Sequence, residues 1–152
     1  MKKIYIESLG CAKNQVDSEV LLAYADEEGY VRVENAEDAD VIVVNTCGFI
    51  ESAKEESINT FFALKERCPD AKIIMAGCLA QRYGKEMELD EADAIFGNHD
   101  LSLFPEVLRN IEKDERSVSI PEYPDPDRER DDRAELLSFP RSAYLKISEG
   151  CN

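Results

Sequence analysis

The sequence predicts an α/β fold with a doubly wound parallel sheet, because short apolar segments alternate with helical patterns along the chain. The clearest segment, 41–44, is a run of valine and isoleucine, which is typical of a strand buried on both faces. Segments 4–6 and 73–75 have the same character. Each of the three is followed within a few residues by a cysteine and then by a helical pattern.

Five strands and four helices are expected from the remaining patterns. Gly29 ends the first helix, Pro69 closes the second, and Asn98 or Asp100 is a candidate cap for the last. Right-handed crossovers favour a flavodoxin-like strand order of 2-1-3-4-5. The expected strands are 3–7, 30–34, 41–44, 72–76 and 94–96, and the expected helices are 15–28, 51–67, 79–87 and 101–111.

The pattern changes after residue 112, which suggests three segments. Residues 1–112 form the α/β domain, and residues 113–140 are expected to be a linker because they are charged, contain prolines and lack apolar periodicity. Residues 142–148 again resemble a strand. We therefore expect 141–152 to be the truncated start of a second domain.

Composition narrows the possible partners. The 152 residues carry a formal net charge of −15, which argues against this segment as a main nucleic-acid-binding element. The acidity fits either a basic partner or simple solubility. No apolar run approaches the roughly 18 residues of a membrane span, and no signal sequence precedes the first strand, so a cytoplasmic location is expected.

Three of the five cysteines, Cys11, Cys47 and Cys78, follow neighbouring strands of the predicted sheet. Parallel strands lie about 4.8 Å apart and end at the same edge, so these thiols are expected to converge there. Thiolates bind zinc, copper(I) or iron–sulfur clusters. The absence of a C-x2-C pair makes zinc less fitting, and three isolated cysteines suit a cubane cluster with one open iron.

The alternative interpretation is that these cysteines are small buried hydrophobic residues. Cys68 lies late in the second helix, at the opposite edge, and is expected to be a structural thiol rather than a ligand. His99 follows the fifth strand and could approach the cysteine edge, but a cap or surface role is expected for it.

Three motifs contain the cysteines: SLGCAKN at 8–14 with DSE at 17–19, NTCGFI at 45–50 with Ala53 and ESI at 56–58, and AGCLAQRY at 76–83. Together they resemble the N-terminal domain of the methylthiotransferases, a family of radical S-adenosylmethionine enzymes, and the resemblance covers about 3–111. The final YLKISEGCN, 144–152, resembles the opening of the radical domain. Of that domain's C-x3-C-x2-C motif, only the first cysteine, Cys151, is present.

This resemblance implies two 4Fe-4S clusters. Cys11, Cys47 and Cys78 would hold the auxiliary cluster, and Cys151 would be the first ligand of the cluster that binds S-adenosyl-L-methionine. The family cleaves that cofactor to a radical, which abstracts hydrogen from an unactivated carbon. No catalytic side chain is assigned, and this chain alone is expected to be inactive.

Two branches of the family compete. One modifies the β-carbon of an aspartate in a small-subunit ribosomal protein, and the other modifies an adenosine in tRNA. The ribosomal-protein branch is the one resembled by Leu9, residues 12–14 and residues 48–50. Membership of that branch implies two partners, the small-subunit ribosomal protein as substrate and an electron donor. Neither a membrane nor direct nucleic-acid binding is expected for this segment. A third possibility is a non-enzymatic flavodoxin-like binding module with structural cysteines.

Overall fold

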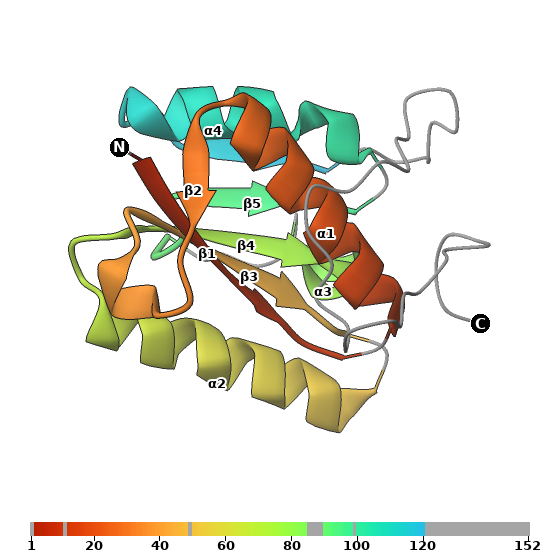
Figure 1. The fold of residues 1–152 in the computed structure, drawn as a ribbon. Helices are drawn as coiled ribbons and strands as arrows, with labels where there is room; N and C mark the ends of the chain where they lie inside the picture. Colours follow the sequence, from red (N-terminus) through yellow and green to blue (C-terminus); the bar gives the residue numbers. More distant parts are fainter. Residues whose placement is uncertain (1, 11, 49, 85–89, 99, 121–152) are drawn as a thin grey trace, which may run out of the picture.

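The computed structural model describes residues 2–10, 12–48, 50–84, 90–98 and 100–120, and within these it forms one sheet with helices on both faces (Figure 1). All strand pairs are parallel, and the strand order is β2-β1-β3-β4-β5-β6. The strands are β1 (Lys2–Ser8), β2 (Tyr30–Arg32), β3 (Val41–Thr46), β4 (Lys72–Gly77), β5 (Ala94–Phe96) and β6 (Ser117–Ser119). The helices are α1 (Ala12–Glu27), α2 (Glu51–Arg67), α3 (Cys78–Tyr83) and α4 (Phe104–Glu112), with short 3-10 turns η1 (Ala36–Asp38) and η2 (Leu101–Leu103).

The predicted fold class and the predicted order of the first five strands are confirmed. The sheet also has a sixth strand, β6, inside the stretch expected to be a linker. Asp114 adopts a left-handed conformation (φ 58°), and this turn directs the chain from α4 back along β5. The short alternation of Val118 and Ile120 was the only sequence signal for this strand, and it is weak.

Two hydrophobic cores lie on opposite faces of the sheet. Val41 and Val43 of β3 pack in the core under α1 and α4, whereas Ile42 and Val44 pack in the core under α2 and α3. Figure 1 shows the same division, with α1 and α4 above the sheet and α2 below it. Because β3 lies in the middle of the sheet and both its faces are covered, all four of these residues need to be apolar.

The segment before α4 shows which of the two candidate caps is used. The carboxylate of Asp100 accepts a hydrogen bond from the backbone N–H of Ser102 at 3.1 Å, so Asp100 caps η2, which leads into α4. The side chain of Asn98 points to a cysteine instead. The alternative of an Asn98 cap is therefore wrong.

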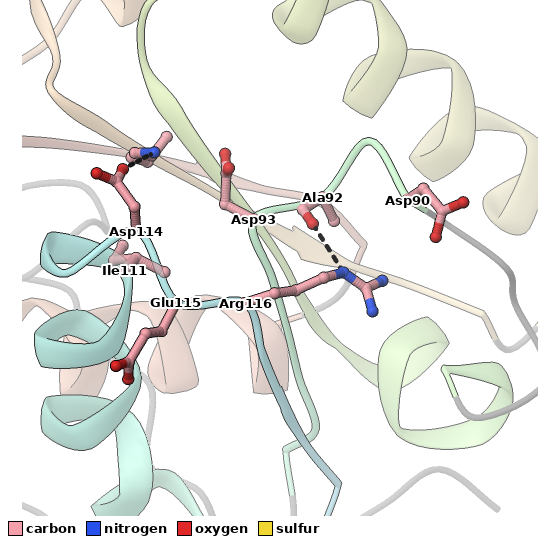
Figure 2. Close-up of a pocket in the computed structure, with 8 residues that line it drawn as sticks. Asp90, Ala92, Asp93, Ile111, Asp114, Glu115 and Arg116 are labelled. Carbon is pink, nitrogen blue, oxygen red and sulfur yellow. Dashed lines mark hydrogen bonds and ion pairs between the residues drawn. The ribbon is translucent and has the colours of Figure 1, made fainter.

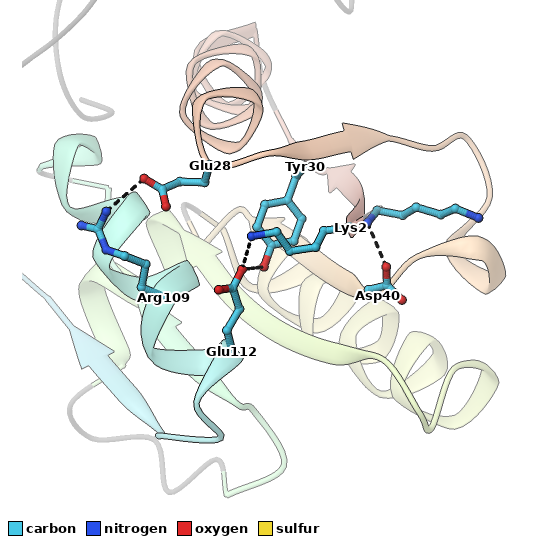
Figure 3. Close-up of polar contacts among 7 residues, drawn as sticks. Lys2, Glu28, Tyr30, Asp40, Arg109 and Glu112 are labelled. Atoms are coloured by element: carbon cyan, nitrogen blue, oxygen red, sulfur yellow. Dashed lines mark hydrogen bonds and ion pairs between the residues drawn. The ribbon is translucent and has the colours of Figure 1, made fainter.

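Polar contacts tie the amino-terminal edge of the sheet to α4 (Figure 3). Lys2 Nζ lies 2.6 Å from Glu112 Oε1, and the Tyr30 hydroxyl donates to the same oxygen at 2.8 Å. Burial and this acceptor raise the pKa of Tyr30, while the Lys2 ammonium lowers the pKa of Glu112. These contacts lie at the edge of the sheet opposite Cys47 and Cys78.

Candidate functional site at the carboxyl edge of the sheet

Strand register brings two of the three predicted ligand cysteines to adjacent places. Thr46, the last residue of β3, pairs with Gly77, the last residue of β4. Cys47 and Cys78 directly follow these two strands, and neither is in a disulfide. They are only 9% and 8% exposed, so both side chains are largely shielded from water.

The loop after β1 lies directly against Cys47. Gly10 has φ +89°, and a Cβ added to it would come within 2.7 Å of the Cys47 Cβ and 3.0 Å of its Sγ. Only glycine fits this approach, and only glycine adopts this φ without strain. The loop that leads to Cys11 is therefore in van der Waals contact with the second cysteine.

Asn14 of α1 connects the loops after β1 and β3. Its Nδ2 donates to the Leu9 carbonyl and to the Thr46 carbonyl, both at 2.8 Å. Its own backbone carbonyl accepts from Asn45 Nδ2 at 2.8 Å. Because Asn14 is fully buried, these bonds form away from water and hold the two loops in one arrangement.

Ser57 of α2 holds the backbone of Cys47 in place. Its hydroxyl accepts from the Cys47 N–H and donates to the Cys47 carbonyl, both at 3.0 Å. Since Ser57 is fully buried, it satisfies two backbone groups that no water reaches. The orientation of Cys47 is thus fixed from α2, even though that helix begins four residues after the cysteine.

The sulfur of Cys78 contacts two buried amides. Its thiol donates to Asn14 Oδ1 at 3.5 Å, and Asn98 Nδ2 donates to the sulfur at 3.3 Å. Cys78 is the first residue of α3, and the preceding Gly77 has φ +92°. A Cβ on Gly77 would lie 2.4 Å from Asn45 Oδ1, so this turn also requires glycine.

Cys68 lies where the sequence predicted, at the opposite edge. It caps the C-terminus of α2, and its N–H donates to the Leu64 carbonyl at 2.9 Å. Its side chain belongs to the core that also contains Phe61 and Ile73. Burial raises the pKa of its thiol, and the nearby Glu37 carboxylate raises it further. Burial with a raised pKa is typical of a structural thiol.

A pocket also lies at the amino-terminal edge of the sheet, away from Cys47 and Cys78 (Figure 2). It is lined by Lys72 at the start of β4, by residues just before β5 and β6, and by Ile111 of α4. Lys72 forms an ion pair with Asp114, and Arg116 Nε donates to the Ala92 carbonyl at 3.4 Å. None of the residues that line it is a cysteine, so it is not the predicted site.

Three residues named from the sequence, Cys11, His99 and Cys151, lie outside the described residues. Within the described part of the chain, no three histidine, cysteine or acidic side chains are grouped closely enough to hold a metal ion. The ligand set Cys11, Cys47 and Cys78 therefore stays a prediction. What is described fits a thiolate-bound cluster: two shielded thiols at paired strand ends, and a glycine loop leading to the third.

Comparison with known families bears on the same segment. The sequence model of a family described as "Uncharacterized protein family UPF0004" matches residues 3–97, which include β1 to β5 and the cysteine edge. The chain belongs to this family. The match includes all three motifs that carry the predicted cysteines.

Three curated relatives are similar over nearly the whole chain, and each is named "Ribosomal protein uS12 methylthiotransferase RimO". The relative from Treponema denticola is 43% identical over 94% of this chain. Those from Chlorobium limicola and Syntrophomonas wolfei are 44% and 45% identical over 100% and 95% of it. The resemblance to the N-terminal domain of the methylthiotransferases is confirmed. This UPF0004 chain spans about a third of the length of these relatives.

The sequence did not reveal which residues support the cysteines. Asn14 and Ser57 stand inside the recognised motifs, yet only the folded chain shows that one bonds across two loops and the other holds Cys47. Asn98 lies outside those motifs. An asparagine directly after a strand that ends at the same edge was the one available signal for it.

The described residues include no helix long and apolar enough to cross a membrane.

Proposed function

We propose that this chain is the cluster-binding domain of a ribosomal protein uS12 methylthiotransferase. The observation that supports the proposal is the pairing of Thr46 with Gly77, the residues directly before Cys47 and Cys78. The identity of about 43% to relatives with that printed name supports the substrate class. A reaction on a ribosomal protein would take place in the cytoplasm, and the −15 charge would suit a basic protein substrate.

Cys11, Cys47 and Cys78 would hold an auxiliary 4Fe-4S cluster, and Cys151 would be the first ligand of a second one that binds S-adenosyl-L-methionine. The auxiliary cluster would present the sulfur that the enzyme inserts. An external electron donor would supply the electrons for the reaction. The residues around it have distinct tasks. Gly10 lets the first loop approach Cys47, Ser57 fixes the backbone of Cys47, and Asn14 keeps the loops together.

The proposal also covers the division of the chain. Residues 1–112 would be the cluster domain, 113–140 a connecting segment and 141–152 the start of the radical domain. β6 lies in the connecting segment, so that segment would begin as an extension of the sheet. The chain alone would bind at most the auxiliary cluster and produce no 5′-deoxyadenosine, because a radical cluster needs three cysteines and only Cys151 is present.

The decisive experiment is anaerobic reconstitution of the chain with iron and sulfide. We expect a brown protein that absorbs near about 400 nm, as iron–sulfur clusters generally do, with about four irons per chain. Cys47→Ser and Cys78→Ser should each lose most of that iron. Cys68→Ser is the matched control, because it changes a buried cysteine at the other edge and should keep the iron content.

Equal iron in the Cys78→Ser variant and the unchanged chain would contradict the proposal. A chain that binds no iron at all would instead support the non-enzymatic binding module. To separate the two enzyme branches, the complete enzyme would be offered the uS12 protein and a tRNA. Methylthiolation of the tRNA alone would contradict the ribosomal-protein assignment.

A further inference from the structure

Asn98 presents a buried amide to the sulfur of Cys78 from a neighbouring strand. It lies two residues after the end of β5, the strand that neighbours β4 in the sheet. Its exposed fraction is 5%. Its Nδ2 lies 3.3 Å from Cys78 Sγ. The adjacent Gly97 N–H donates to the Ser119 carbonyl of β6 at 2.8 Å. The sixth strand therefore fixes the backbone from which Asn98 reaches the sulfur.

The two amides at Cys78 have opposite hydrogen-bonding roles. Asn14 Oδ1 accepts a hydrogen bond from the thiol, whereas Asn98 Nδ2 donates one to the sulfur. A metal-bound cysteine is a thiolate and has no proton to donate. Of these two contacts, the one from Asn14 is then lost as a hydrogen bond, and the one from Asn98 becomes charge-assisted and stronger.

The cap of the helical segment that follows Asn98 is a different residue. Asp100 caps that segment through Ser102, so the amide of Asn98 is not needed there. A buried amide N–H directed at sulfur is a known means of tuning an iron–sulfur centre, because a donor stabilises the more negative, reduced state.

We propose that Asn98 is a positioning residue that hydrogen-bonds the Cys78 thiolate and raises the reduction potential of the cluster held at this edge. The inference rests on the cluster site proposed above. Reduction here adds one electron from an external reductant, with no bond formed or broken and no proton moved. Without the Asn98 donor, the extra negative charge of the reduced cluster is less well stabilised.

The test is to measure the midpoint potential of the cluster in the reconstituted chain. The chain is titrated with dithionite, and the reduced cluster is monitored by electron paramagnetic resonance. Asn98→Leu removes the donor at similar size. We expect about a tenfold shift of the one-electron equilibrium toward the oxidised state, which equals about 59 mV in the negative direction. Asn35→Leu, which removes an exposed amide beside η1, is the matched control and should leave the potential unchanged. Asn98→Gln retains an amide donor, so its midpoint potential should lie between those of Asn98→Leu and the unchanged chain.

An unchanged potential in Asn98→Leu, at equal iron content, would overturn the inference while leaving the proposed function intact. Loss of iron from Asn98→Leu with native circular dichroism would also overturn it, because Asn98 would then serve cluster assembly. If Asn98→Leu does not fold, Asn98→Asp replaces it. Its carboxylate would repel the thiolate, and a potential that is unchanged or more positive would again refute the role. An unchanged chain that binds no iron would overturn both proposals.

Discussion

Replacing Asn14 with alanine tests whether a single side chain holds the two loops of the site together. The amide donates to the Leu9 and Thr46 carbonyls at 2.8 Å from a fully buried position. Losing the donor to the buried Thr46 carbonyl costs about 1–3 kcal/mol, and the half-buried Leu9 carbonyl adds about 0.5–1 kcal/mol. We therefore expect Asn14→Ala to lower the free energy of unfolding by about 1.5–4 kcal/mol.

Urea unfolding of the reduced, iron-free chain, followed by circular dichroism, measures this change. For a domain of this size each kcal/mol lowers Tm by about 3–6 °C, so a drop of about 5–24 °C is expected in a thermal scan. Asn59→Ala is the matched control, because Asn59 is an exposed asparagine within α2 and gains similar helix propensity on mutation. It should change stability by less than about 0.5 kcal/mol in the destabilising direction.

A loss below about 1 kcal/mol in Asn14→Ala, relative to Asn59→Ala, would refute the reasoning, because the loops would then be held by other contacts. Asn14→Asp gives a second readout. A carboxylate keeps the shape but offers no N–H to either carbonyl, so at neutral pH this variant should be at least as unstable as Asn14→Ala.

Three further changes can be measured by the same methods. Gly77→Ala should cost more than about 3 kcal/mol, because its Cβ would lie 2.4 Å from Asn45 Oδ1 at a φ of +92°; near-native stability would show that this turn relaxes freely. Ser57→Ala leaves the buried N–H and carbonyl of Cys47 without their hydroxyl partner, so it should cost about 1–3 kcal/mol and lower the iron content; unchanged iron would separate that backbone contact from cluster binding. Glu112 has a lowered folded-state pKa, so its contribution is present above the unfolded pKa of about 4.3 and is lost as pH falls through the folded value. Glu112→Gln should therefore cost about 0.5 kcal/mol at pH 7, a small value because solvent screens this partly exposed pair, and nothing near pH 2; a difference that persists at pH 2 would refute the assignment.

Much of the fold followed from local patterns. The apolar run 41–44 and its two counterparts predicted buried parallel strands, and the order of the first five strands was correct. The first helix begins at Ala12, three residues earlier than expected, because polar residues at its start concealed the pattern. β6 was missed because it has three residues, one of which, Val118, is exposed, so its alternation carries little signal.

The sequence by itself determined the chemistry available at the site. Strand ends followed by cysteines placed Cys47 and Cys78 at one edge, because continuous apolar runs that alternate with helical patterns predict parallel strands, and parallel strands share their carboxyl edge. It also separated Cys68 from them, since about 17 helical residues carry the chain across to the other edge.

Only the tertiary structure decided which polar groups face the sulfur atoms. Asn98 and Cys78 are 20 residues apart, and the sequence offered a helix cap as an equally good task for Asn98. The choice depended on β6 fixing Gly97, on Asp100 taking the cap, and on burial that leaves an amide no water to bond. Hydrogen bonds between distant segments depend on distance and direction in the folded chain, and residue patterns along the sequence do not encode these.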